Sequence, residues 1–469
     1  MEGISDCGGQ CAWGGNRMTE ELFIRNVTEQ IRCVKARDGI AKELSDHIED
    51  QAAVYEEAGE SHEEAVIRAV REMGDPVEVG VELDRIHRPQ VDFKMIGMAF
   101  IFSIAGFFII YKVDNLSQYP EYIMRQCVVL LLSFGVMAGM YFLDYSFIGR
   151  YAYGICVFAT IAIYISTMFA QPHGVISINF TLVYLYVPIY AGILYRLRRR
   201  GYSAVAWGIG IQIVIAGLAY MLSGTLYTAV NVYMMCTVLL IMAIWKSWFA
   251  VDKKTAVAIV IGALVLAPMG LLIIRSVLYG REYGFQIQRL LAWLNPERYA
   301  EGAGYIYQWI RQELGMAKWI GASGSNTFAR DELLGMGQPM PYPTEPFVLF
   351  QLVCTYGILT GLALILAFTA VIVRSFQIVR RQKNQLGFMI SAACFMVFLF
   401  NCLEGVLINT GYYPVSSMQF PFVSYGACTG ITYAVLIGLL LSIYRNERII
   451  TDEVSKRPTW RLSIKWEKR

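Results

Sequence analysis

The sequence predicts an all-α polytopic membrane protein of about ten transmembrane helices, preceded by a small soluble helical domain. Three observations support this fold class. Hydrophobic residues make up 56% of the 469 residues and charged residues only 16%, which is not the composition of an ordinary soluble domain. Apolar stretches near the roughly 20 residues that cross a bilayer recur after residue 93. The residues before that point are rich in charge and carry apolar side chains at helical spacing.

Residues 1–17 precede any helical pattern, and we expect them to form a disordered tail. They include the stretch CGGQC, Cys7 to Cys11, which has the spacing of a small metal or redox pair. No second cysteine pair and no nearby histidine completes a metal site. Most of the ten cysteines lie in or beside apolar segments, where a thiol packs as a small hydrophobe, so we expect no disulfide framework. No apolar core precedes residue 93, so no cleavable signal peptide is expected.

Residues 18–90 indicate a cytoplasmic domain of about three or four short helices. Ser61 and Glu64 have the spacing of a capping box at the start of one helix. Asp75 and Pro76 supply the cap and the first-turn residue of the next helix. This pattern resembles the permease-prefix-like domain that precedes various bacterial membrane proteins, a resemblance that says little about chemistry.

The membrane domain, residues 93–450, contains about ten apolar stretches that are long enough to cross a bilayer. They lie at about 94–112, 124–143, 151–170, 177–195, 202–222, 226–244, 255–279, 347–373, 386–408 and 422–444. Residues 451–469 follow as a cytoplasmic tail.

Basic residues cluster in every second gap between these stretches and after the last one. They are Arg196, Arg198, Arg199, Arg200, Lys246, Lys253, Lys254, Arg374, Arg380, Arg381, Lys383, Arg445 and Arg448. By the positive-inside rule these gaps face the cytoplasm, which places both termini inside. The net charge of +3 does not favour a nucleic-acid partner, so the expected partner of this surface is the lipid bilayer.

The longest gap, residues 280–346, separates spans seven and eight and faces outward in this topology. It alternates charged residues with aromatic residues, which suit a membrane interface. The aromatic residues include Trp293, Trp309, Trp319, Tyr299, Tyr305, Tyr307 and Tyr342. Loops that only connect spans are short, so this large extracellular loop is the first candidate for a functional surface.

The stretch GYYPVSSMQFPFVSYGACTG, Gly411 to Gly430, resembles the signature of the SEDS family, the shape, elongation, division and sporulation proteins of RodA, FtsW and SpoVE type. The matching residues are Gly411, Pro414, Pro421, Phe422, Ser424, Tyr425 and Gly426. The family's second glycine and the serine after it are replaced by Ala427 and Cys428.

Two further blocks carry the same resemblance. The stretch RLLAWLNPERYAEGAGYIYQ matches a family block, with a small insertion, at Arg289, Pro296, Tyr307 and Gln308. At the end of the large loop the family has threonine, aspartate and phenylalanine, and this chain has Thr344, Glu345 and Phe347. Pro346 is an extra residue between the acid and the phenylalanine.

The resemblance implies a peptidoglycan glycosyltransferase of the bacterial plasma membrane that polymerises lipid II, an undecaprenyl-linked disaccharide, in cell-wall synthesis. Its process would be cell division, cell shape or sporulation. It also implies a class B penicillin-binding protein as partner and a divalent metal, Mg²⁺ or Mn²⁺. The family's catalytic aspartate corresponds to Glu345, which would act as general base or metal ligand. Substrate contacts are expected at Arg289, Arg311, Tyr307, Gln308, Ser424 and Tyr425, where the two arginines suit phosphate oxygens.

The chain also departs from the family. Glu345 is one methylene longer than aspartate, and a shift of about 1 Å can cost about a hundredfold in rate. Charged residues that the family carries near spans four and five are absent, since Ser177 stands at the place of a lysine and Ser223 to Thr228 lacks an aspartate. The stretch before Ser177 is Gln171, Pro172, His173 and Gly174, whose histidine we expect to be merely exposed. Either the enzyme is diverged or it no longer polymerises.

Simpler interpretations of the candidate residues stay open. An acid at a membrane boundary, such as Glu345, is often a solvated interfacial group, and Asp331 and Glu332 are the alternative loop acids. Arg289 would also suit an anchor to lipid headgroups. The run from Ser424 to Gly426 suits close helix packing.

One ionisable group lies inside a span. Glu404 in span nine lies near Asn401, at a depth where charge is costly, so it must be paired, neutral or facing a wet cavity. Arg275 in span seven is a candidate partner for this polar site.

Two other classes of function compete with the polymerase. The missing charges favour a catalytically degenerate scaffold or regulator of a penicillin-binding protein. A transporter of the lipid-linked precursor is the third, although no repeat relates the two halves of the sequence.

Overall fold

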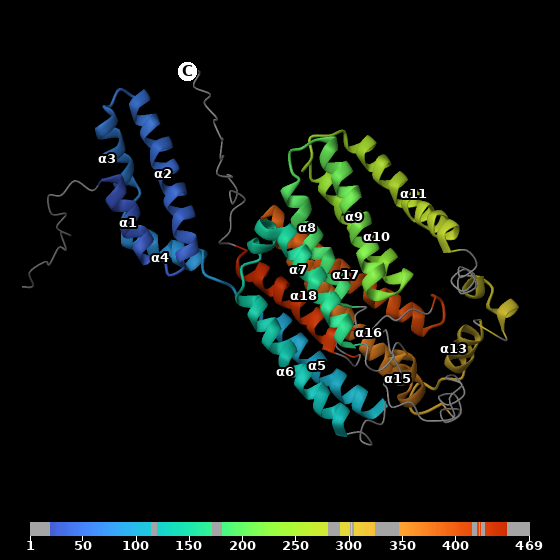
Figure 1. Cartoon of the computed structure of the whole chain (residues 1–469). Coiled ribbons are helices and arrows are strands. Elements are labelled where there is room, and N and C mark those ends of the chain that lie inside the picture. The colour runs from blue at the N-terminus through green and yellow to red at the C-terminus, as the bar shows by residue number, and fades with distance from the viewer. Residues whose placement is uncertain are drawn as a thin grey trace, which may run out of the picture. The chain divides into compact units, whose positions relative to one another are not determined.

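The computed structural model describes residues 19–113, 120–170, 181–279, 291–300, 302, 304–323, 347–414, 420–421, 423 and 427–447. The chain divides into two compact units, residues 1–90 with 448–469 and residues 91–447. The described residues are almost all helical and contain no strand, which confirms the predicted fold class (Figure 1).

Residues 19–90, the described part of the first unit, form four helices, in the region where about three or four were expected. They are α1 Glu20–Gln30, α2 Val34–Glu57, α3 His62–Glu72 and α4 Pro76–Ile86. Their apolar faces meet in one core around Phe23, Val27, Ile31, Ile40 and Ile48. This unit therefore has a hydrophobic core of its own.

Side-chain caps set the ends of these helices. The Thr19 hydroxyl accepts the backbone N–H of Leu22 at the start of α1, and the Asp75 carboxylate accepts that of Val77 at the start of α4. At α3 the predicted N-cap residue, Ser61, is correct, but the capping box is not formed. The Ser61 hydroxyl donates to Glu64 at 2.8 Å and accepts no backbone N–H of the helix.

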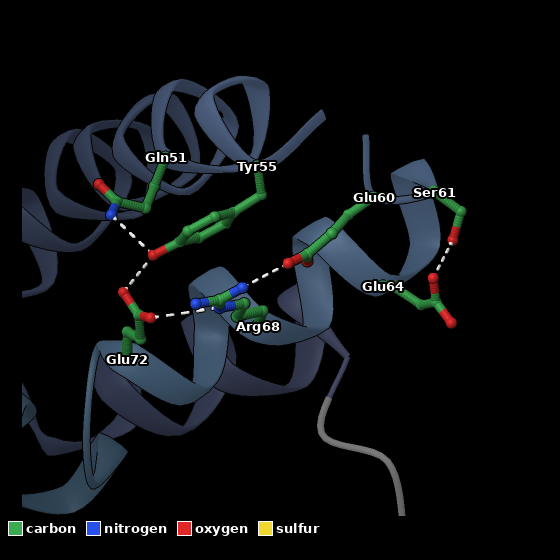
Figure 2. A network of polar contacts seen from close by, with 7 residues as sticks. All are labelled: Gln51, Tyr55, Glu60, Ser61, Glu64, Arg68 and Glu72. Atoms are coloured by element: carbon green, nitrogen blue, oxygen red, sulfur yellow. Dashed lines mark hydrogen bonds and ion pairs between the residues drawn. The ribbon is translucent and has the colours of Figure 1, made fainter. Parts of the chain in front are cut away.

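A polar network covers the contact between α2 and α3 (Figure 2). The Tyr55 hydroxyl lies between Gln51 and Glu72, and Arg68 pairs with both Glu60 and Glu72. The Arg68 guanidinium also lies 4.4 Å from the centre of the Tyr55 ring. Glu60 and Glu72 therefore have partners within the domain.

The second unit has helices at all ten predicted spans. They are α5 Phe93–Val113, α6 Pro120–Phe142, α7 Ser146–Ala170, η3 Leu182–Leu185 with α8 Tyr186–Arg196, α9 Tyr202–Ser223, α10 Leu226–Trp245, α11 Lys253–Tyr279, α15 Val348–Tyr356 with α16 Ile358–Arg381, α17 Gln385–Asn409 and α18 Ala427–Arg445. Among the described residues, 7 helices are long and apolar enough to cross a membrane, namely α6, α7, α9, α10, α16, α17 and α18.

Two spans are interrupted where the sequence predicted continuous helices. Span four begins with the short 3-10 helix η3 before α8. Span eight breaks at Gly357, whose φ of 104° excludes most other residues. A Cβ there would lie 2.7 Å from the Trp319 carbonyl oxygen, so the break admits the chain of the large loop. Backbone bonds from Gly321 N to Tyr356 O and from Ile358 N to Lys318 O join the two segments.

The basic clusters meet at one end of the helix bundle, here called the basic end. Arg198 after α8 donates to Gln385 at the start of α17 at 2.9 Å. Lys246 after α10 lies 3.8 Å from the centre of the Phe388 ring. Arg374 near the end of α16 pairs with Asp92 before α5 at 2.8 Å. The basic gaps therefore share one side, as the topology requires.

Candidate functional site

The opposite end, here called the loop end, contains residues 291–323 of the large loop and the turn after α17. Helix α17 runs toward this end (Figure 1). Helix α13 Tyr305–Gly315 contacts α15 there. A short 3-10 helix, η5 Pro296–Tyr299, precedes α13 and packs against it. The three sequence blocks that carry the family resemblance all lead to this end.

The turn after α17 is built on Gly411. This residue has a φ of 73°, in the left-handed region, and a Cβ there would lie 3.0 Å from the Tyr307 carbonyl oxygen. Its own carbonyl oxygen accepts hydrogen bonds from Arg311 Nε at 3.1 Å and Nη2 at 2.8 Å. The signature block and the loop block are thus joined through the backbone of one glycine.

The start of α15 joins the same assembly. The Asn409 side chain at the end of α17 accepts the Phe350 backbone N–H at 2.8 Å and donates to the Gly405 carbonyl at 2.8 Å. Phe350 packs edge-on against Trp309 of α13. Phe347 packs on the same apolar cluster, around the buried Ile310. Phe347, the described residue of the third block, therefore packs against α13 and the start of α15.

Aromatic residues surround this turn. The Trp293 indole N–H donates to the Tyr412 carbonyl at 3.0 Å, and the Arg311 guanidinium lies 4.4 Å from the centre of the Tyr412 ring. Tyr413 contacts both Trp293 and Tyr227, with ring centres 6.4 Å apart in each pair. Burial, helped by the charge of Glu404 and by Tyr227, raises the pKa of Tyr413 to about 12.

A cluster of polar side chains lies inside the helix bundle, near the turn after α17. Glu404 is only 7% exposed and accepts a hydrogen bond from the Asn231 side chain of α10. Asn231 also bonds to Tyr184 of η3. Asn401, one turn earlier in α17, donates to the Tyr433 hydroxyl of α18 at 2.8 Å. Four helical segments therefore meet at this cluster, where Glu404 is hydrogen-bonded to an uncharged amide.

The described residues test the predicted site only in part. Tyr307 is 3% exposed and packs inward, Gln308 is half-buried in α13, and Arg311 is bound to Gly411. Their substrate contacts stay predictions. The described partner of Glu404 is Asn231, whereas the side chain of Arg275, in α11, lies outside the described residues. Also outside them are Glu345, Arg289, Ser424, Tyr425, Asp331, Glu332 and His173.

The turn between α9 and α10 carries hydroxyl groups where the family has an aspartate. The Thr225 hydroxyl donates to that of Thr228 at 2.6 Å, and Ser223 caps the end of α9 by donating to the Ala219 carbonyl at 2.6 Å. Gly224, with a φ of 68°, closes the turn. No charged side chain stands in this turn, so the departure seen in the sequence is built into the local structure.

The implied divalent metal finds no complete ligand set in the part of the chain that the structure describes. No group of three or more His, Cys, Asp or Glu side chains among those residues is placed to hold a metal ion. The predicted ligand, Glu345, is not among them. The metal therefore stays a prediction from the family resemblance.

Sequence reasoning missed several residues that build this end. Asn409 ties α15 to α17, Asn231 binds Glu404, and Gly357 breaks span eight. Asn231 and Glu404 are 173 positions apart, so no local pattern relates them. The polar side chains of Asn231 and Asn409 within apolar stretches were the available signal.

Comparison with known proteins identifies relatives. The model of the FtsW, RodA and SpoVE family of cell cycle proteins matches residues 171–449. A probable peptidoglycan glycosyltransferase FtsW from Idiomarina loihiensis is 27% identical over 176 residues, which are 37% of this chain and 42% of that protein. Stage V sporulation protein E from Bacillus subtilis is 24% identical over 170 residues, which are 35% of this chain and 43% of that protein.

A solved structure shares the fold. It comes from work on the structural coordination of polymerization and crosslinking by a peptidoglycan synthase complex, and it aligns with a TM-score of 0.58 at 16% identity. The alignment covers 76% of this chain and 98% of that chain. The sequence matches span less than half the length of each relative, whereas the family model covers more than half of this chain. This chain therefore belongs to the FtsW, RodA and SpoVE family of cell cycle proteins, the SEDS family.

Proposed function

We propose that the chain is a peptidoglycan glycosyltransferase that polymerises lipid II at the outer face of a bacterial plasma membrane. In this proposal the basic end faces the cytoplasm, where both termini lie, because positively charged loops stay on that side. The loop end then faces the compartment in which cell wall is made. The named activity of the FtsW relatives supports this assignment.

One observation carries the proposal. The three blocks that resemble the family are separated in sequence, with 36 positions from Arg311 to Phe347 and 64 from Phe347 to Gly411, yet these three residues belong to one packed assembly at the loop end. Such an assembly holds Phe347, two positions after Glu345, at the loop end, and this supports the proposal.

The chemistry follows from what the substrate requires. A sugar hydroxyl of the acceptor must lose a proton as it attacks the anomeric carbon of the donor, and a lipid-linked pyrophosphate leaves. Glu345 is assigned as the general base. Arg289 would pair with the diphosphate oxygens. A divalent metal bound with Glu345 would neutralise the leaving diphosphate.

The test is glycan synthesis from labelled lipid II by the purified protein in detergent or nanodiscs, with a candidate class B penicillin-binding protein and with or without Mg²⁺ or Mn²⁺. Wild type should make strands, and Glu345→Ala should reduce the rate by about a hundredfold or more, the usual effect of losing a general base. Asp331→Ala, a loss of charge in the same loop, should leave the rate within about twofold, since that acid takes no part in the proposed step.

No strands from any folded variant with partner present would overturn the polymerase proposal. Activity of Glu345→Ala equal to wild type would instead remove Glu345 from the mechanism. If Asp331→Ala lost activity and Glu345→Ala did not, Asp331 would be the general base.

The second candidate is a scaffold or regulator of a penicillin-binding protein. The hydroxyl-lined turn between α9 and α10 supports it, because Ser223, Thr225 and Thr228 bond to one another or to the backbone and offer no charge. This candidate predicts co-purification with the partner and a change in the partner's crosslinking rate without glycan synthesis. A lipid-precursor transporter would move labelled lipid II across a liposome bilayer in the absence of polymerisation.

A further inference from the structure

Helix α4 of the first unit has one face that packs inward and one that has no cover among the described residues. Gly80 is buried against α1, and a Cβ there would lie 2.8 Å from both the Val27 carbonyl oxygen and the Gln30 side chain. On the outer face, Val77 is 47% and Val81 57% exposed. A shallow pocket on this face is lined by Val77, Glu78, Val81, Glu82 and Arg85.

The acidic residues of this face differ from Glu60 and Glu72 of the same domain. On the α2–α3 side, Glu60 and Glu72 are paired with Arg68 and Tyr55 (Figure 2). Within the described part of the chain, Glu78 and Glu82 have no hydrogen-bond or ion-pair partner. The α4 face therefore offers an apolar strip edged by unpaired negative charge.

The C-terminal tail has the complementary pattern. Residues 456–469, KRPTWRLSIKWEKR, contain 6 basic residues and 1 acidic residue. Residues 19–90 contain 18 acidic and 9 basic residues. In the tail, Trp460, Leu462, Ile464 and Trp466 alternate with polar residues, so in an extended conformation these apolar side chains share one face.

The spacing of the two patterns also agrees. Val77 and Val81 are four residues apart on a helix, a rise of about 6 Å. Alternate residues of an extended segment, such as Leu462 and Ile464, are separated by about 6.6 Å. Two neighbouring apolar side chains of the tail can therefore lie over the two valines. Arg461 and Lys465 start on the opposite face of the segment, and their long side chains can extend past its edges to the glutamates.

The chain segments that connect α4 and the tail to the helix bundle both start near the Arg374 side chain. Asp92, which follows the first unit, pairs with Arg374 at 2.8 Å, and the same guanidinium lies 5.4 Å from the centre of the Tyr444 ring at the end of α18. The 13 residues from Glu447 to Trp460 reach up to about 45 Å when extended. Val81 is 11 residues before Asp92, and because residues 81–86 are helical the reach is up to about 30 Å. Tethering at one point gives the two segments a high effective concentration.

We propose that the C-terminal tail, residues 456–469, docks on the outer face of α4, with its tryptophans and aliphatic residues on Val77 and Val81 and its basic residues on Glu78 and Glu82. This contact would make the first unit and the tail one cytoplasmic module. It is independent of the glycosyltransferase proposal, because no residue of the loop end takes part.

The experiment uses the full-length protein in nanodiscs of phosphatidylethanolamine and phosphatidylglycerol, with the photoreactive residue p-benzoylphenylalanine in place of Trp460 or of Trp466. Irradiation and peptide mass spectrometry should place the crosslinks on residues 77–85. The double variant Glu78→Lys with Glu82→Lys should reduce them about tenfold, because two attractions become two repulsions. Adding Arg461→Glu and Lys465→Glu to that variant should restore them.

The matched control is Glu49→Lys with Glu57→Lys, which changes net charge equally on exposed positions of α2 and should leave the crosslinks unchanged. Crosslinks confined to lipid would show that the basic tail binds the membrane surface and would overturn the proposal. Equal loss in the control variant, or no loss in the α4 variant, would overturn it as well.

Discussion

At the scale of single residues, the Asp92–Arg374 pair has the largest consequence for stability. The Asp92 side chain is 1% exposed and the Arg374 side chain 12%. Asp92 also caps α5 by accepting the Met95 backbone N–H at 3.2 Å. Removing one partner of such a pair leaves a buried charge unpaired, which is more costly than the pair is worth when intact.

We expect Arg374→Ala to lower the free energy of unfolding by about 3–5 kcal/mol. The control Arg381→Ala, an exposed position at the end of the same helix, should change it by less than about 0.5 kcal/mol. Thermal unfolding of the detergent-solubilised protein gives both values. Combining Arg374→Ala with Asp92→Asn should recover part of the loss, and no recovery would contradict the unpaired-charge explanation.

Gly411 is the second residue of interest, because its backbone conformation and the space around it exclude a side chain. Gly411→Ala forces a side chain into left-handed backbone and toward the Tyr307 carbonyl, so we expect a loss of about 1–2 kcal/mol in stability. Glycan synthesis should fall with it, because the turn holds Arg311. Gly315→Ala in α13 meets no atom within 4 Å and is the matched control. Equal effects of the two substitutions on the unfolding midpoint would contradict this account.

His62 reports on the first unit by itself. The nearby Glu56 carboxylate raises the pKa of His62 above its ordinary value of 6.5. Because the raised pKa belongs to the folded state, the contact stabilises below about pH 6.5 and is lost as the pH rises through the folded pKa. NMR titration of the labelled histidines should show this raised value, and Glu56→Gln should lower it. An unchanged pKa in Glu56→Gln would exclude the contact.

At the scale of elements, α6 and α18 are held by small residues. A Cβ on Gly438 of α18 would lie 2.5 Å from Met140 Cβ and 2.8 Å from the Met137 carbonyl oxygen of α6. Small residues of this kind let helix backbones approach closely inside a membrane, where apolar burial gives little driving force. The packing of these two spans therefore depends on the absence of a side chain at position 438.

Gly438→Leu should separate the two helices and destabilise the protein by about 2–3 kcal/mol or more, as overpacking does. Gly139→Ala on α6, where no atom lies within 4 Å, should have little effect. A cysteine pair across the helices, one on each, gives the direct measurement, since its crosslinking yield should drop in Gly438→Leu and not in Gly139→Ala. An unchanged yield in Gly438→Leu would show that the contact tolerates a side chain.

The elements also show what sequence can predict and where it stops. The lengths of the hydrophobic stretches predicted helices at ten positions, and the structure has helices at all of them. The prediction works because crossing a bilayer requires every backbone group to be bonded within the segment. It could not show the break at Gly357, which depends on the approach of Trp319 from a distant loop. Nor could it pair Asp92 with Arg374, 282 positions away, since only the folded bundle makes them neighbours.

At the scale of the whole molecule, part of the candidate site could be predicted from the sequence and part could not. Motif spacing identified the blocks around Tyr307, Phe347 and Gly411, and the structure brings these together at the loop end. The individual roles were harder to predict, because Arg311 binds a backbone carbonyl and Tyr307 is buried. A motif records which residues are needed, and only packing shows whether a side chain supports the site or faces a ligand.

The central claim is that the loop end polymerises lipid II with Glu345 as its base. The most direct measurement is the rate of glycan-strand formation from labelled lipid II by wild type and Glu345→Ala, with partner and divalent metal supplied. The account predicts strands from wild type and a rate lower by about a hundredfold in the variant. Equal rates in the two proteins, or no strands from folded wild type, would contradict it.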